Sequence, residues 1–179
     1  FEGKRKNCEN ESKLCKIIRN DSIEEFITFI NQFNISVDAR LKLSVFETNS
    51  MLLKSGDTSI IEYAAFCGSI QIFQYLLTND AKYEHSIWLY GIHSNNPEII
   101  NLIESSQFNS PDFNFLVCLK EAIKCHHNNI ADYIMNNFTV SVDDSEFGEN
   151  VDAYGIHYHN YVFYPENLDD KNNFLYFVK

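Results

Sequence analysis

Residues 59–81 read Ser-Ile-Ile-Glu-Tyr-Ala-Ala-Phe-Cys-Gly-Ser-Ile-Gln-Ile-Phe-Gln-Tyr-Leu-Leu-Thr-Asn-Asp-Ala, and this stretch decides the expected fold. Ser59 precedes an apolar run and Glu62 follows three positions later, which is the capping-box signature of a helix N-terminus. Gly68 then supplies a residue that can turn the chain at little steric cost. A second helix with a wide apolar face is expected from Ser69. The stretch therefore predicts two short helices joined by a tight turn, and neither is long enough to be stable without neighbours.

Weaker copies of this helix–turn–helix unit flank the central one. Small or apolar residues equivalent to Ala64 occur at Ile17, Gly91, Ala122 and Gly155. In the copy after residue 86, Asn95 is expected to take the turn and Pro97 to start the second helix, where proline is tolerated. We expect units near residues 12–30, 59–78, 86–104 and 117–136, a degenerate unit in 150–179, an insertion in 31–58 and an N-terminal flank in 1–11.

The insertion has apolar clusters at residues 45–46 and 51–53, so we expect it to pack on the repeats. Gly56-Asp57-Thr58 predicts a turn at its end. Aromatic residues at helical spacing on the second helices are expected to belong to the core; they are Phe26, Phe29, Phe73 and Tyr75.

The stretches 60–76, 88–93 and 121–128 resemble a divergent ankyrin-repeat family that carries an uncharacterised ankyrin-like domain and is expanded in parasitic protists. The resemblance covers residues 12–179. It implies an all-α fold, an ankyrin-type repeat solenoid of stacked helix–turn–helix units, whose period is near 33 residues. The chain departs from a consensus ankyrin repeat in lacking Thr-Pro-Leu-His and most turn glycines.

In such a solenoid the first helices and the connecting fingers form a concave binding face. The resemblance implies that the residues just after the paired small residues point into this face: Arg19, Asn20, Phe66, Cys67, His93, Ser94, Lys124 and Cys125. Phe66, with Arg19 and His93, is the first candidate for a binding anchor. The implied function is a non-catalytic protein–protein interaction. The alternatives are that these residues are ordinary solvated positions, or that the chain is a structural spacer or stacking segment of a longer repeat protein.

Composition restricts the class of partner. The chain of 179 residues is 45% hydrophobic and 15% aromatic, which favours a folded core over disorder. Its net charge of −11 argues against nucleic acid, because phosphates need clustered Lys and Arg. No apolar run approaches the length of about 18 residues that a membrane span needs. We therefore expect an unknown protein partner and no nucleic acid, membrane or small-molecule substrate.

The cysteines predict a cellular location, and the ends of the chain predict that it is part of a longer protein. Five cysteines without a Cys-x-x-Cys pair favour a reduced, intracellular and cytoplasmic location. The chain begins with Phe1 and ends in an apolar segment, 172–179, that is typical of a helix start. We expect the chain to be a fragment of a longer repeat protein.

One cluster could bind zinc. Two thiols and two imidazoles occur within ten residues, at Cys118, Cys125, His126 and His127. Zinc needs four converging ligands, but neighbouring histidines cannot share one helix face. We favour a buried Cys118 with the histidines in a turn.

Two further clusters could bind metal. His157 and His159 would project from one side of a strand but diverge on a helix, and the sequence leaves helix or strand open for residues 150–165. Asp143, Asp144 and Glu146 lack the spacing of a calcium loop and are expected in a solvated connection. No nucleotide-binding or hydrolase motif occurs in the chain. We therefore predict no enzyme activity, no cofactor and no metal. After the interaction module and the structural spacer, a metal-dependent enzyme is the third class of function that we consider.

Overall fold

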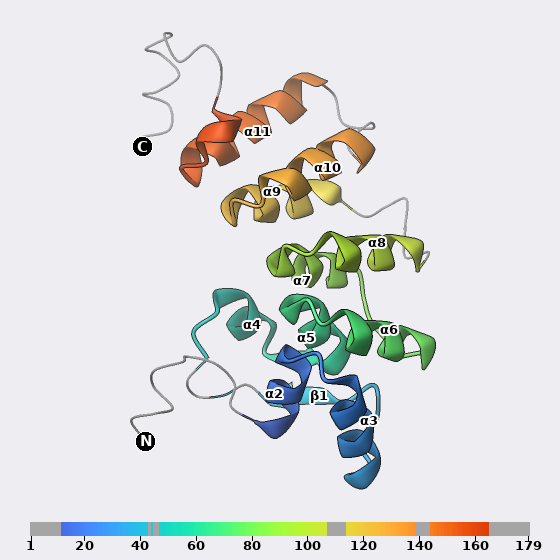
Figure 1. Ribbon diagram of the computed structural model, residues 1–179. Helices are drawn as coiled ribbons and strands as arrows, with labels where there is room; N and C mark the ends of the chain where they lie inside the picture. The colour runs from blue at the N-terminus through green and yellow to red at the C-terminus, as the bar shows by residue number, and fades with distance from the viewer. Residues whose placement is uncertain (1–11, 43, 45–46, 107–113, 139–143, 165–179) are drawn as a thin grey trace. The chain divides into compact units, whose positions relative to one another are not determined.

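The structure is a computed structural model that describes residues 12–42, 44, 47–106, 114–138 and 144–164 (Figure 1). The described residues are mostly helical, which confirms the expected all-α class. The chain divides into two compact units, Phe1–Asn109 (unit 1) and Ser110–Lys179 (unit 2). Within the described ranges, every helix is too short or too polar to cross a membrane.

Unit 1 contains three successive helix pairs. These are α2 (Lys13–Arg19) with α3 (Ile23–Gln32), α5 (Ile60–Cys67) with α6 (Ile70–Thr78), and α7 (Ile87–Ser94) with α8 (Pro97–Ser105). The first helices pack side by side, α2 against α5 and α5 against α7. The second helices form another row, α3 against α6 and α6 against α8. The pairs therefore stack in two layers, in the order of the sequence.

The central pair has the local structure that its sequence predicts. The backbone N–H of Ser59 donates to Glu62 Oε2 at 2.8 Å, and the N–H of Glu62 donates to Ser59 Oγ at 3.3 Å. Both bonds of the capping box at the start of α5 are therefore present, as expected. Gly68 ends the helix with a left-handed φ of 73°, and Asn95 takes the same role after α7 with a φ of 51°. Pro97 occupies the first turn of α8. The predicted turns and helix starts are confirmed.

Small residues are buried where the helices pack. Ala64 and Ala65 of α5 are fully buried. A Cβ atom at Gly91 of α7 would lie 2.7 Å from Cδ1 of Ile103 in α8, closer than real contacts allow, so Gly91 serves the packing of α7 on its own second helix. The expected aromatic core is confirmed for Phe26 and Phe73, which are fully buried, whereas Phe29 and Tyr75 are partly exposed.

Among the residues that the structure describes, two short strands occur, in the insertion and at its junction with the central unit, and the sequence did not predict them. β1 (Arg40–Lys42) and β2 (Asp57–Ser59) pair antiparallel, with Leu41 opposite Thr58. Both of these side chains are buried, Leu41 to 7% and Thr58 to 1% exposure. The predicted turn at residues 56–58 is therefore wrong beyond Gly56, because Asp57 and Thr58 are strand residues that lie opposite Lys42 and Leu41 of β1. Only Gly56 has a turn-like positive φ, of 71°.

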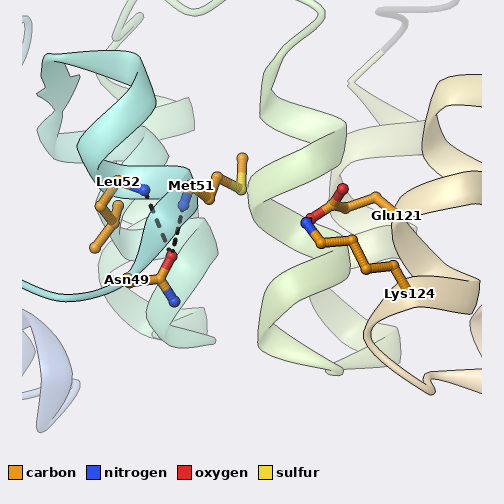
Figure 2. A network of polar contacts seen from close by, with 5 residues as sticks. All are labelled: Asn49, Met51, Leu52, Glu121 and Lys124. Carbon is orange, nitrogen blue, oxygen red and sulfur yellow. Dashed lines mark hydrogen bonds and ion pairs between the residues drawn. The ribbon is translucent and has the colours of Figure 1, made fainter. Parts of the chain in front are cut away.

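A short helix, α4 (Ser50–Ser55), lies between the strands in sequence. Figure 2 shows its start, where Oδ1 of Asn49 accepts hydrogen bonds from the N–H groups of Met51 at 3.0 Å and Leu52 at 3.5 Å. Leu52 is 2% exposed, so this part of the insertion is packed, as expected. Leu53 is 49% exposed, and residues 45–46 lie outside the described residues.

Unit 2 contains α9 (Phe115–Lys124), α10 (Asn128–Phe138), α11 (Asp144–His157) and a short 3₁₀ helix η1 (Tyr161–Phe163). Helix α9 packs against α10 and α11, and η1 packs against α11. Asn160 joins these elements, because its side-chain amide donates to the carbonyl of Ile123 at 2.9 Å and to Oδ1 of Asn128 at 2.8 Å. It is fully buried.

Helix α11 corrects two expectations. Asp144 and Glu146 lie in a helix rather than in a solvated connection, and Asp143 lies outside the described residues. Acidic residues are enriched in the first turn of helices, so Asp144 and Glu146 suit the start of α11. The strand alternative for His157 and His159 is also wrong, because α11 continues to His157 and His159 follows with a left-handed φ of 54°. The expected helix start in 172–179 lies outside the described residues.

The pairs of unit 1 are linked by caps that reach from one pair to the next. Ser69 is the N-cap residue of α6, but its hydroxyl donates to the carbonyl of Ile18 at 2.6 Å. The free N–H groups of α6 are instead bound by Asp21, from the turn between α2 and α3. Its carboxylate accepts from the N–H groups of Gln71 and Ile72, both at 3.0 Å. Asp21 therefore caps a helix of the following pair.

We expect Asp21→Ala to lower the free energy of unfolding by about 1 kcal/mol more than Asp80→Ala, because a lost helix cap costs about that much. The comparison is matched, since both aspartates have a left-handed φ, 47° at Asp21 and 56° at Asp80. The strain that alanine introduces there is thus common to both variants. Urea unfolding monitored by circular dichroism measures the difference. Equal losses would contradict the capping role.

A glycine in unit 2 gives a second prediction. A Cβ atom at Gly155 would collide with the backbone carbonyl of Phe163. Helix propensity alone predicts that Gly155→Ala stabilises the helix by up to about 1 kcal/mol. We expect the opposite sign, a loss of about 1–3 kcal/mol, because the clash is with backbone. Denaturant unfolding decides between the two, with His157→Ala on the exposed surface of the same helix as control.

Candidate functional site

A row of side chains crosses the first helices of unit 1. Nη1 of Arg19, at the end of α2, donates a hydrogen bond of 2.8 Å to the hydroxyl of Tyr63 in α5. The ring of Tyr63 stacks on Phe66, one turn later in α5, with centroids 6.3 Å apart. Phe66 in turn faces the imidazole of His93 in α7, at 5.5 Å and an interplanar angle of 32°. We call Arg19, Tyr63, Phe66 and His93 the cross-helix row.

The members of the row differ in burial. Tyr63 is only 5% exposed, whereas Arg19, Phe66 and His93 are half-buried. Burial raises the pKa of Tyr63, and the nearby Cys67 and Cys15 raise it further, against the opposing hydrogen bond from Arg19. The phenol therefore stays protonated at neutral pH and holds the guanidinium and the Phe66 ring in place. The half-buried members each keep part of the side chain accessible to solvent.

The predicted residues of unit 1 fall into two groups. Arg19, Phe66 and His93, selected from positions after the small residues, are brought together in the row. Ser94 has a structural task, because its hydroxyl donates to the carbonyl of Gly91 at 2.6 Å and accepts from the N–H of Asn96 at 3.2 Å. The other two, Asn20 and Cys67, lie beside the row in sequence; Asn20 is the exposed C-cap of α2 and Cys67 ends α5, half-buried.

Sequence reasoning missed Tyr63, which links α2 to the aromatic pair. The residue precedes Ala64, whereas the predicted positions all follow the small pair. A signal was available, because Tyr63 and Phe66 are three residues apart and so neighbour each other on a helix. Its partner Arg19 is 44 residues away in the chain, which no local pattern reveals.

The remaining predicted residues, Lys124 and Cys125, belong to unit 2. Lys124 Nζ pairs with Glu121 Oε1 at 2.7 Å, one turn back in α9 (Figure 2). The hydrogen bond to Glu121 raises the pKa of Lys124, so the ammonium stays charged. Such a partly exposed pair contributes little stability, typically below about 1 kcal/mol. Cys125 is the C-cap of α9 and half-buried.

The four possible zinc ligands in and after α9 have the geometry of an ordinary helix end and turn; they are Cys118, Cys125, His126 and His127. Cys118 is fully buried, and burial raises its pKa, so the thiol stays protonated and is a poor metal ligand. His126 is exposed in the turn before α10 with a left-handed φ of 58°. His127 follows it and is half-buried. The prediction of a buried Cys118 with His126 in a turn is confirmed.

No family model, curated protein or solved structure matches this chain. The function is therefore argued from the geometry of the residues themselves.

Thiol reactivity tests which side of the first helices is accessible. Cys15 and Cys118 are fully buried, and burial raises the pKa of both thiols, whereas Cys67 is half-buried. We expect iodoacetamide at pH 8 to modify Cys67 at least about tenfold faster than the other two, because the thiolate is the reacting form and one pKa unit changes its fraction tenfold. Peptide mass spectrometry over time measures the rates.

In concentrated guanidinium chloride the three thiols should react alike, which controls for local sequence. Native Cys15 reacting as fast as Cys67 would contradict the packing of α2 on α5.

Proposed function

We propose that the chain is a non-catalytic protein-interaction module that binds a protein partner through the face carrying the cross-helix row. The observation that supports this most is the continuity of the row over three helices. Arg19, Phe66 and His93 come from α2, α5 and α7, and each keeps part of its side chain exposed. Arginine and aromatic residues are over-represented among the residues that dominate binding energy in protein interfaces, and the row contains an arginine, a tyrosine and a phenylalanine.

The stacking of unit 1 supports an ankyrin-like repeat as the architecture. The first helices pack in one row and the second helices in another, with left-handed residues in the turns of each pair. Buried small residues recur at equivalent positions, at Ala64 and Gly91. A repeat of this type presents an extended surface built from equivalent positions of successive units. The row has this form.

Preorganisation explains why these residues suit binding. Phe66 is held between the Tyr63 ring on one side and His93 on the other, and Arg19 is held by the Tyr63 hydroxyl. Fixing a side chain at an interface costs about 0.5–1.5 kcal/mol, and less of that cost remains when the side chain is already ordered. The net charge of −11 further favours encounter with a basic partner. An intracellular protein with a basic surface is the partner we propose.

Phe66→Ala should weaken capture of the partner at least about tenfold, because truncating a central aromatic anchor costs 2 kcal/mol or more. The test is an affinity pull-down from lysate of the source cells, with the natural chain and the variant as baits. Phe33→Ala is the matched control: Phe33 is an aromatic residue of unit 1 with 57% exposure, located at the end of the second-layer helix α3. Far-ultraviolet dichroism checks that all baits fold alike.

Three results would count against the proposal. Equal capture by Phe66→Ala and the natural chain would place the interface elsewhere. A loss of helicity in Phe66→Ala would identify Phe66 as a core residue. Failure of the natural chain to capture any protein would favour a structural spacer.

A further inference from the structure

The end of unit 2 repeats the connection that joins the two helices of each other pair. In every described pair, a residue with a left-handed φ is followed by one further residue and then by the second helix. The left-handed residues are Asp21, Gly68, Asn95, His126 and His159. The second helices begin two residues later, at Ile23, Ile70, Pro97 and Asn128, and η1 begins at the same place, at Tyr161. Helix α11 and η1 are therefore the two members of a fifth pair.

Burial follows the same register. Phe163, the third residue of η1, is 7% exposed, and the third residues of α6, α8 and α10 are buried too; these are Ile72, Ile99 and Ile130. The second residue of each longer second helix is exposed and polar: Glu24, Gln71, Glu98 and Asn129. In η1 the second residue is Val162, which is 64% exposed, and Tyr161 before it is 77% exposed. We call Tyr161 and Val162 the end patch. It is apolar at a position that is polar in the other pairs.

The second member of the fifth pair is also short. η1 has three residues, whereas α3, α6, α8 and α10 have nine to eleven. Pro165 follows Tyr164 in the sequence and has no N–H to donate to the carbonyl four residues back, so the sequence does not favour extending η1 as an α-helix. Among the described residues, the fifth pair therefore has one turn where each other pair has a full second helix.

The residue before η1 keeps a buried acceptor unsatisfied. The side-chain amide of Asn160 donates to Ile123 and Asn128, but its Oδ1 is buried without a hydrogen-bonding partner among the described residues. Asn96 has the equivalent position before α8. Its amide donates to the carbonyl of Gly68 at 3.4 Å, and its Oδ1 accepts from the N–H of Glu98 at 3.0 Å. Buried polar groups are nearly always hydrogen-bonded, so the start of the fifth second helix is incomplete.

The sequence after η1 contains an apolar segment. Residues 165–173 read Pro-Glu-Asn-Leu-Asp-Asp-Lys-Asn-Asn and are mostly polar, and residues 174–178 read Phe-Leu-Tyr-Phe-Val. Both stretches lie outside the described residues. Nine residues span up to about 30 Å when extended, which is enough for the apolar segment to return to the end patch. A short flexible tether also gives the segment an effective concentration in about the millimolar range.

We propose that residues 174–178 fold back onto the end patch and supply the missing part of the second-helix layer in unit 2. Contact between the two buries apolar surface of both, which is the main driving force for such an association. The covering segment also brings backbone N–H groups to the turn at Asn160, whose Oδ1 is otherwise unsatisfied. This contact lies within unit 2 and does not depend on the proposed partner.

Hydroxyl-radical footprinting of the full chain, read by peptide mass spectrometry, tests the contact. We expect Tyr161 to be oxidised at least about fivefold more slowly in the natural chain than in Leu175→Asp/Phe177→Asp, because the loss of each buried apolar side chain weakens docking about tenfold or more. Phe33, which is 57% exposed in unit 1, calibrates the radical dose. Equal oxidation of Tyr161 in the two chains would overturn the inference.

The matched control adds the same two charges at polar positions of the same stretch. Asn172→Asp/Asn173→Asp should leave Tyr161 as protected as it is in the natural chain. Loss of protection in this control as well would refute an apolar contact, because added charge alone would then be the cause. Far-ultraviolet dichroism checks that all chains keep their helicity.

The reciprocal variant changes the end patch. Tyr161→Ser/Val162→Asp gives η1 the polar surface of the other second helices at two exposed positions. It should raise the oxidation of Phe177 at least about fivefold, because the apolar surface that covers the segment is lost. Val117→Asp, at a 50% exposed valine of α9, is the control and should leave Phe177 unchanged. Unchanged oxidation of Phe177 in the patch variant would contradict the proposal.

Dilution separates the chain's own segment from that of a second copy. An intramolecular contact keeps Tyr161 protected when the protein concentration is lowered about a hundredfold, because the tether fixes the effective concentration. Protection that is lost on dilution would overturn the inference in favour of a segment exchanged between copies.

Discussion

The paired helices of unit 1 are seven to ten residues long, and isolated helices of this length are marginal in water. Each one therefore depends on its neighbours for burial and for its terminal backbone groups. Asp21 binds the N–H groups of α6 from the preceding pair, and Ser69 returns a bond to the carbonyl of Ile18. Between the next two pairs, Glu62 accepts from Ser86 and the Asn96 amide donates to the Gly68 carbonyl. Stability is thus shared between pairs, and no pair is complete alone.

This dependence also creates the candidate site. Because α2, α5 and α7 pack side by side, residues near their ends come into one line: Tyr63 joins Arg19 to Phe66, and Phe66 contacts His93. A cavity of about 480 Å³ arises from the same arrangement, because the second strand of the insertion comes directly before α5, and residues of both strands and of the segment before α7 line a common space.

Local signals in the sequence were sufficient for the helix pairs. Ser59 with Glu62, Gly68, Asn95 and Pro97 each act within a few residues, and their geometry follows from capping and turn chemistry. The features that escaped prediction depend on partners far along the chain. Tyr63 meets Arg19 across 44 residues, Asn160 meets Ile123 across 37, and Thr58 is a strand residue only because Leu41 lies opposite.

Tyr63 connects the stability of unit 1 to its proposed binding surface. The ring is part of the core and its hydroxyl is part of the row, so any partner that fixes Arg19 and Phe66 also favours the packed position of Tyr63. A ligand that binds only the folded state stabilises it by an amount that grows with the logarithm of the ratio of its concentration to the dissociation constant. Binding at the row would therefore stabilise the packing of α2 on α5. This is the packing on which the burial of Cys15 depends. For the same reason, a truncation of Tyr63 could not measure the contribution of the row to binding, because it would remove core packing together with the contacts of the row. A truncation of Phe66 removes contacts of the row and leaves the core packing in place.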